Sequence, residues 1–106
     1  MNVYTIYADM KEDMSATDFV TKMSAFLNSL PTMASYRITR MKLGFRSMDL
    51  PEFRIDMEFK SMQDLDDAMT HVVQDVDNIE DKHVAFNSMV DIETIQHFLY
   101  RDYPDE

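Results

Sequence analysis

The stretch Glu52-Phe53-Arg54-Ile55-Asp56-Met57-Glu58-Phe59-Lys60 alternates polar and apolar side chains at every position. Because successive side chains of a strand point to opposite faces of a sheet, this alternation predicts a strand with one buried face. A second strand is predicted from about Tyr36 to Phe45. A third is predicted over residues 3–8, which are rich in β-branched and aromatic side chains.

Two amphipathic helices separate these strands. The first is predicted to begin at Ser15, whose hydroxyl can cap free backbone N–H groups, and to end at Pro31; the second begins at Ser61. Adding 46 to each cap and core position of the first helix gives a residue of the same type in the second. The matched sets are Ser15, Asp18, Phe19, Met23, Phe26, Leu27, Leu30 and Ser61, Asp64, Leu65, Met69, Val72, Val73, Val76. This repeat predicts a ferredoxin-like α+β fold, βαββαβ, with a four-stranded antiparallel sheet.

The C-terminal third carries two further patterns. Helical spacing predicts a third helical segment through Ile79, His83, Phe86 and Val90. Residues 93–101 are predicted to form the fourth strand, with Ile95, His97 and Leu99 on one face. A helix is the alternative for the same residues, through Ile92, Ile95, Phe98 and Leu99.

Charged residues predict how the second and third strands pair. If the numbers of paired residues add up to 98, three opposite charges meet on the polar face: Arg46 with Glu52, Lys42 with Asp56 and Arg40 with Glu58. Each cross-strand pair contributes about 0.2–1 kcal/mol. A sum of 96 loses this pattern, because it places Lys42 opposite Arg54. The chosen register puts Tyr36 and Ile38 on the polar face and leaves a loop from Ser47 to Pro51.

Composition excludes several classes of function. A charge of −10 at pH 7 repels a phosphate backbone, so no nucleic-acid partner is expected. The chain has no cysteine for a disulfide, a zinc ribbon or a thiol nucleophile, and its single glycine excludes glycine-rich phosphate loops. No apolar run can span a bilayer, and the N-terminus shows no secretory signal. No residue spacing implies a metal or a cofactor. We expect a soluble cytoplasmic protein with one domain spanning residues 1–106.

The pattern is similar to that of a known superfamily. The repeated strand–helix–strand unit, the extra segment at His83-Val84-Ala85-Phe86 and the late strand ending Tyr100-Arg101-Asp102 resemble dimeric α+β-barrel proteins. The stress-responsive A/B-barrel group of that superfamily looks most similar. The resemblance implies a homodimer in which two sheets pair face to face. Members of the superfamily include cofactor-free monooxygenases, isomerases and proteins without assigned activity, so the resemblance does not specify the function.

Seven residues are candidates for a site on such a sheet. Arg54 faces Gly44 in the predicted register, so its guanidinium is free to bind an anionic or carbonyl-bearing ligand. His97 and Tyr7 are the candidate catalytic groups, since His97 can act as an acid or base if it faces the lumen. The remaining candidates for ligand binding are Tyr36, Tyr100, Asp56 and Glu58. A salt-bridge ladder is the alternative role for the two carboxylates, and a place on the core face is the alternative for His97.

Three functions are compatible with these residues. The preferred one is a homodimer that binds a small organic ligand between its paired sheets. The second is a cofactor-independent monooxygenase or isomerase that acts on a small aromatic or carbonyl substrate, with His97 or Tyr7 handling the proton. The third is a structural dimerisation module that presents acidic helix residues, Asp64, Asp66 and Asp67, to a basic protein partner.

Overall fold

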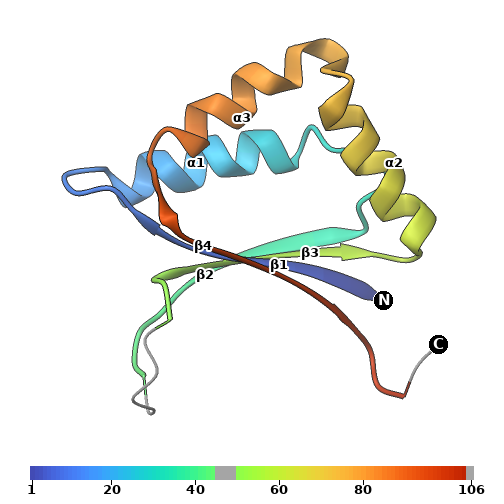
Figure 1. Cartoon of the computed structure of the whole chain (residues 1–106), viewed down its shortest axis with the longest axis horizontal. Helices are drawn as coiled ribbons and strands as arrows, with labels where there is room; N and C mark the ends of the chain where they lie inside the picture. Colours follow the sequence, from blue (N-terminus) through green and yellow to red (C-terminus); the bar gives the residue numbers. More distant parts are fainter. Residues whose placement is uncertain (45–49, 105–106) are drawn as a thin grey trace.

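The computed structural model describes residues 1–44 and 50–104. Its elements follow in the order β1 (Asn2–Met10), α1 (Ala16–Leu27), β2 (Ser35–Arg40), β3 (Phe53–Phe59), α2 (Met62–Val73), the short 3-10 helix η1 (Val76–Asn78), α3 (Ile79–Asn87) and β4 (Val90–Arg101). The strands form one antiparallel sheet in the order β2-β3-β1-β4. The helices α1, α2 and α3 lie on one side of this sheet (Figure 1). This arrangement confirms the predicted ferredoxin-like α+β fold.

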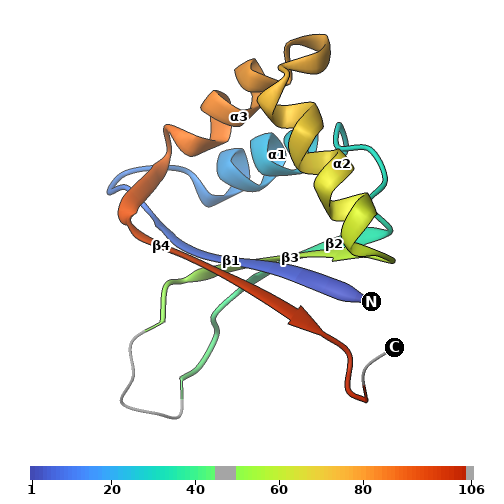
Figure 2. The same ribbon diagram turned by 45° about the vertical axis from the view of Figure 1, so that its right-hand side comes forward.

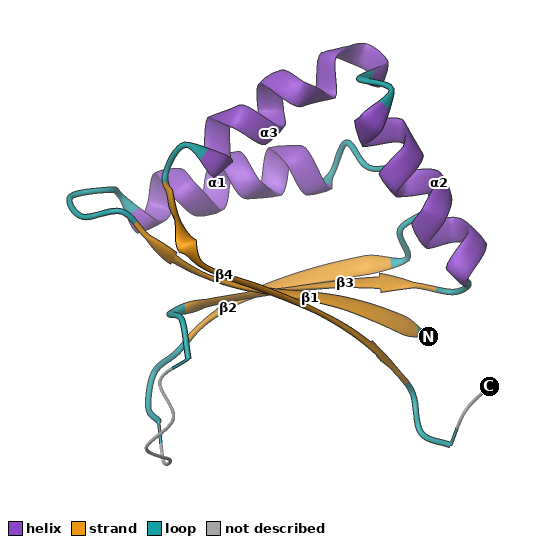
Figure 3. Cartoon of the chain, in the orientation of Figure 1, coloured by secondary structure: helices purple, strands orange, loops and turns teal. Residues whose placement is uncertain are grey.

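The two predicted helix starts are confirmed by their caps. The backbone N–H of Asp18 donates to Ser15 Oγ at 3.2 Å, and that of Asp64 donates to Ser61 Oγ at 3.1 Å. The predicted stripe of α2 is wrong at Val73, which is 85% exposed. Figure 3 shows the reason, because α2 rises away from the sheet along its length and its last turn lies far from the strands.

The pairing of β2 with β3 differs from the predicted register. Partner numbers add up to 93, with Tyr36 opposite Met57 and Ile38 opposite Ile55. Tyr36 and Ile38 therefore lie on the helix side, where they pack against the core. Burying a large apolar side chain contributes roughly 1.5–3 kcal/mol, which exceeds the gain from a cross-strand ion pair. β2 also ends at Arg40, while the predicted strand end and most of the predicted loop, residues 45–49, lie outside the described residues.

β4 is a strand, as predicted, and not the alternative helix. It begins at Val90, earlier than expected, because α3 ends at Asn87. Tyr7 of β1 lies opposite Gln96, but Asp9 lies opposite Asp91, so β4 advances five residues where β1 advances two. Such a bulge bends a strand. Figure 2 shows β4 curving from the helix layer across the edge of the sheet to the side without helices.

The core fills the space between the sheet and the helices. Its most buried large side chains come from both layers: Phe19, Met23, Leu27, Ile55, Phe59 and Ile79. Thr5, which lies on the side of the sheet without helices, is also fully buried. Within residues 1–44 and 50–104, no helix is both long and apolar enough to cross a membrane.

Candidate functional site

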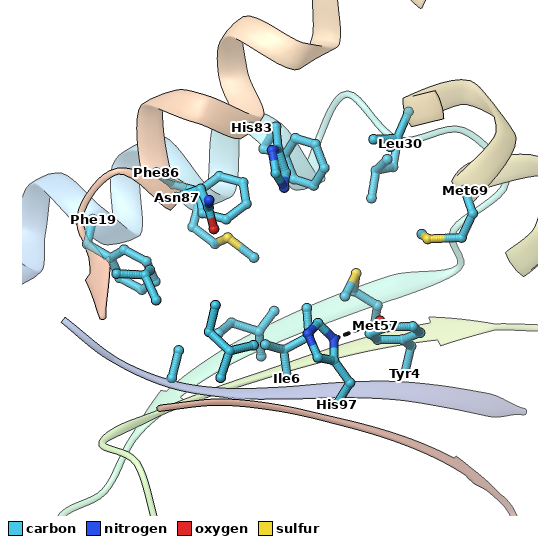
Figure 4. Close-up of a pocket in the computed structure, with 17 residues that line it drawn as sticks. Tyr4, Ile6, Phe19, Leu30, Met57, Met69, His83, Phe86, Asn87 and His97 are labelled. Atoms are coloured by element: carbon cyan, nitrogen blue, oxygen red, sulfur yellow. Dashed lines mark hydrogen bonds between the residues drawn. The ribbon is translucent and has the colours of Figure 1, made fainter. Parts of the chain in front are cut away.

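A cavity of about 180 Å³ lies between the sheet and the helices, and side chains from β1, β3, β4, α1, α2 and α3 line it. Most of the lining is aromatic, aliphatic or methionine (Figure 4). We call it the sheet–helix cavity. It is defined by Tyr4, Ile6, Ala8, Phe19, Met23, Phe26, Leu30, Ile55, Met57, Met69, Val72, His83, Phe86, Asn87, Val90, Ile95 and His97.

Tyr4 and His97 provide polar groups on the sheet side of this cavity. The Tyr4 hydroxyl and His97 Nδ1 are 2.8 Å apart, and the two rings meet edge to face with 5.8 Å between their centroids. His97 is exposed and Tyr4 is half-buried, so the pair lies where the cavity meets solvent at the edge strand β4. Burial raises the pKa of the Tyr4 phenol. The hydroxyl therefore keeps its proton at neutral pH.

His83 and Asn87 are the polar side chains that α3 brings to the cavity. The ring of His83 packs edge-on against Phe26 and Phe86, with centroid distances of 5.5 and 5.2 Å. His83 Nδ1 also lies 3.4 Å from Glu80 Oε1. These contacts hold the His83 ring in the helix layer, opposite the side of the cavity that carries His97 (Figure 4).

No helix covers the other side of the sheet in the described part of the chain (Figure 1). We call this side the open face. The pairing of the strands places on it Val3, Thr5, Tyr7, Ser35, Arg37, Thr39, Arg54, Asp56, Glu58, Gln96, Phe98 and Tyr100. Phe98 and Tyr100 are 43% and 50% exposed. The ring of Tyr7 meets that of Phe98 edge to face at 6.0 Å, so aromatic surface is continuous across two strands.

Polar contacts on the open face centre on Asp56. Thr5 Oγ1 donates to Asp56 Oδ1 at 2.6 Å, and Arg54 Nε lies 3.0 Å from Asp56 Oδ2. The Arg54 guanidinium also lies 5.7 Å from the centroid of the Tyr7 ring. Burial lowers the pKa of Arg54, but the hydrogen bond and charge of Asp56 outweigh it, so the pKa is raised. The prediction that the guanidinium of Arg54 is unclaimed is therefore wrong.

The predicted salt-bridge ladder is also wrong. Asp56 lies opposite Arg37, and Glu58 lies opposite Ser35, whose hydroxyl donates to Glu58 Oε2 at 2.9 Å. Arg40 forms its ion pair with Glu52 instead. These differences follow directly from the shifted register of β2.

The predicted site residues divide between the two sides of the sheet. Tyr7, Arg54, Asp56, Glu58 and Tyr100 share the open face. The other two, Tyr36 and His97, lie on the helix side. Tyr36 is thus not on the polar face where it was expected, and the sheet separates Tyr7 from His97.

Tyr4 was missed by the reasoning from sequence. Its partner His97 is 93 residues away in the chain. The two meet because Tyr4 pairs with Leu99 and Ile6 pairs with His97 across β1 and β4. Only the pairing of the first strand with the last would have revealed this contact. Among the described residues, no group of three His, Asp or Glu side chains is placed to hold a metal ion.

Three solved structures illustrate what the fold is similar to. A dimeric ferredoxin-like protein of unknown function from Jannaschia sp. CCS1 is 8% identical, with a TM-score of 0.70 over 95% of this chain and 98% of that one. A DABB family protein with a ferredoxin-like fold from Mesorhizobium loti is 14% identical, with a TM-score of 0.65 over 95% of each chain. SnoaB, a cofactor-independent oxygenase from Streptomyces nogalater, is 12% identical, with a TM-score of 0.62 over 98% and 97%.

These similarities bear out the predicted resemblance in fold to dimeric ferredoxin-like and DABB family proteins. At such low identity they show the fold alone. No curated protein matches the chain. The sequence model of one family, described as a family of unknown function (DUF6614), matches residues 1–106.

Proposed function

The chain belongs to the DUF6614 family of unknown function, and we propose from its geometry that it is a homodimer whose subunits each bind a small apolar ligand in the sheet–helix cavity. The cavity itself carries this proposal. Protein interiors are close-packed, and an empty apolar space of this kind costs stability. An apolar space of this size between the sheet and the helices therefore favours a binding role.

The size of the cavity limits the ligand. A dry apolar cavity of about 150 Å³ in another protein holds one benzene molecule, and drug-sized ligands need roughly 300–1,000 Å³. At about 180 Å³, the sheet–helix cavity fits a molecule with a single ring or a comparable aliphatic group. We therefore place the ligand inside each subunit, on the helix side of the sheet.

The open face supports the homodimer. The whole chain carries a charge of −10, but at the centre of the open face Arg37 and Arg54 lie beside Asp56 and Glu58, and these four formal charges cancel. Two copies can approach through this central part with less repulsion than through a surface that carries only carboxylates. A two-fold interface also requires a surface that complements itself, and mixed charges around exposed aromatic rings meet that requirement. The similar Jannaschia protein is described as dimeric.

Benzene is the simplest probe of the cavity. We expect benzene to raise the midpoint of thermal unfolding, because a ligand that binds only the folded state stabilises it. Ala8→Leu should abolish this rise, since Ala8 is 3% exposed and lines the cavity. The same change at Ala25, which is exposed on α1, should leave the rise intact. An equal response of both variants to benzene would contradict the proposed cavity.

Native mass spectrometry tests the dimer. We expect the purified protein to have twice the mass of its 12.5 kDa chain. Any passenger in the cavity would add a small mass that is lost on denaturation. A monomer at micromolar concentration would contradict pairing through the open face.

A second candidate function is a cofactor-independent oxygenase or isomerase. The observation that favours it is the Tyr4–His97 pair at the mouth of an apolar cavity, where His97 would exchange a proton with a bound aromatic or carbonyl substrate. SnoaB, a cofactor-independent oxygenase, has a similar fold. Oxygen uptake with a panel of electron-rich phenols tests this function. Turnover that His97→Ala leaves unchanged would exclude His97 from the chemistry.

A further inference from the structure

The contact between Tyr4 and His97 determines which hydrogen-bonding group the cavity offers on its sheet side. A neutral imidazole has one N–H donor and one bare nitrogen that accepts, and the partner of one nitrogen fixes the state of the other. The Tyr4 hydroxyl lies 2.8 Å from His97 Nδ1. The direction of this one hydrogen bond therefore assigns the proton on His97.

Tyr4 is the donor in this bond. A phenolic O–H is a stronger donor than a neutral imidazole N–H, and a bare imidazole nitrogen is a stronger acceptor than a phenolic oxygen. Burial raises the pKa of the Tyr4 phenol, which keeps the donating proton in place at neutral pH. Nδ1 of His97 accepts, so the proton of the neutral ring is on Nε2.

Nε2 is directed away from Tyr4, because the two ring nitrogens of an imidazole point in divergent directions. Figure 4 shows the His97 ring standing between the sheet and the helix layer, with its second nitrogen on the side away from Tyr4. The residue opposite His97 on β1 is Ile6, and the preceding residue of β4 on the same face is Ile95. Neither side chain can accept a hydrogen bond, and among the described residues the hydrogen bond of the His97 ring is made through Nδ1, so Nε2 is available to a ligand or water.

We infer that Tyr4 holds His97 as the Nε2–H tautomer, so that the sheet side of the cavity offers an N–H donor and selects small aromatic ligands that carry a carbonyl oxygen. This inference rests on the proposed ligand cavity and adds the chemical class of its ligand. Tyr4 is a positioning residue, because it acts on the ligand through the tautomer and orientation that it gives to His97. His97 supplies the donor.

Nitrogen-15 NMR of the histidine rings tests the tautomer directly. In the wild-type protein we expect His97 Nε2 to resonate as a protonated nitrogen and Nδ1 as a bare one that accepts a hydrogen bond. Tyr4→Phe removes the hydroxyl and should move the Nδ1 resonance, while Tyr103→Phe, at a residue 96% exposed, should leave it in place. A protonated Nδ1 in the wild-type protein would overturn the inference.

Acetophenone and α-methylstyrene test the ligand class, because they have the same shape and differ by a carbonyl oxygen in place of a methylene group. We expect wild-type protein to bind acetophenone about tenfold more tightly, which is the effect of one hydrogen bond of typical net strength. His97→Phe should bring the two affinities within about twofold. His71→Phe is the matched control, since His71 lies on α2 outside the cavity lining, and it should keep the tenfold preference.

The outcomes separate the inference from the function on which it rests. If wild-type protein binds both compounds equally and also binds benzene, the proposed donor is overturned and the proposed cavity stands. Failure of benzene, acetophenone and α-methylstyrene to bind overturns the cavity and the inference together. A preference for acetophenone that His97→Phe leaves unchanged shows that another donor recognises the carbonyl, and it also overturns the inference.

Discussion

The two sides of the sheet use the same strands for opposite purposes. On the helix side, Phe53, Ile55 and Met57 of β3 are at most 3% exposed, and Ile55 and Met57 border the sheet–helix cavity. On the open face, Arg54, Asp56 and Glu58 of the same strand alternate with them and meet no helix. One strand thus contributes to an apolar cavity on one side and presents charged side chains on the other.

This difference shows why the alternation of a strand defines two candidate sites at once. A helix layer closes one face and makes binding inside the subunit feasible. The other face keeps exposed aromatic rings, Phe98 and Tyr100, beside paired charges. A surface of this kind is typical of contact with another protein surface.

The largest expected effect is the loss of folding stability when a side chain on the helix side is truncated, compared with the same kind of change on the open face. Ile55→Ala should lower the free energy of unfolding by about 2–5 kcal/mol, because Ile55 is 1% exposed and its methyl groups leave a cavity in the core. Val3→Ala on the open face should cost about 1 kcal/mol or less in the monomer. Urea unfolding at low protein concentration measures both values. Equal losses would show that the open face is packed as tightly as the core within one subunit.

The next effect concerns the dimer. Phe98→Asp should weaken dimerisation by about 2 kcal/mol or more, roughly 30-fold in Kd, because it buries a carboxylate in place of an aromatic ring. Val73→Asp on α2 replaces another exposed apolar residue and should leave the dimer intact. Analytical ultracentrifugation over a range of concentrations measures the difference. A dimer that Val73→Asp dissociates and Phe98→Asp preserves would place the interface on the helix side.

A smaller effect tests the buried polar contact of the open face. Thr5→Val should lower the free energy of unfolding by about 1.5 kcal/mol, because the fully buried hydroxyl donates to the Asp56 carboxylate. Thr39→Val is the matched control on the same face, where the hydroxyl makes only a 3.5 Å contact with the Arg54 carbonyl. It should cost less than about 0.5 kcal/mol. Equal losses would mean that the hydrogen bond to Asp56 contributes no more to the free energy of unfolding than the weak contact of Thr39.

The smallest effect is a pH dependence on the helix side. Burial raises the pKa of Tyr4 above its ordinary value of 10.0, so the unfolded chain loses this proton first as the pH rises. The free energy of unfolding should therefore fall from about pH 10 upward and level off above the folded pKa. Tyr4→Phe should remove this part of the alkaline loss, whereas Tyr103→Phe should not. The same alkaline slope in wild type and Tyr4→Phe would contradict the raised pKa.

Local patterns predicted most of the fold. The alternation of residues 52–60 and the two serine caps correspond to β3, α1 and α2 in the structure. Each of these signals depends on neighbours in the sequence, so no distant contact was needed to interpret them. The repeat of the strand–helix–strand unit then predicted the ferredoxin-like fold.

Distant contacts explain what the sequence could not predict. The register of β2 was wrong because weak cross-strand charge pairs were weighed without the larger gain from burying Tyr36 and Ile38. The ion pair between Arg54 and Asp56 was missed for a different reason, because only cross-strand partners were considered and these two residues are neighbours on one face of the same strand. The contact between Tyr4 and His97 was not predicted, because it depends on the pairing of β1 with β4 and on the bulge in β4. The cavity depends on how three helices lie over the sheet, which no local pattern reveals.

The most direct test of the account is to locate a bound ligand on one side of the sheet. Nuclear Overhauser effects between acetophenone and side-chain methyl groups measure this in solution. We expect contacts with Met23, Met57 and Met69, which line the cavity from α1, β3 and α2. Contacts with Val3 and the rings of Tyr7 and Phe98, without any to these methionines, would place the ligand on the open face and contradict the division between the two sides.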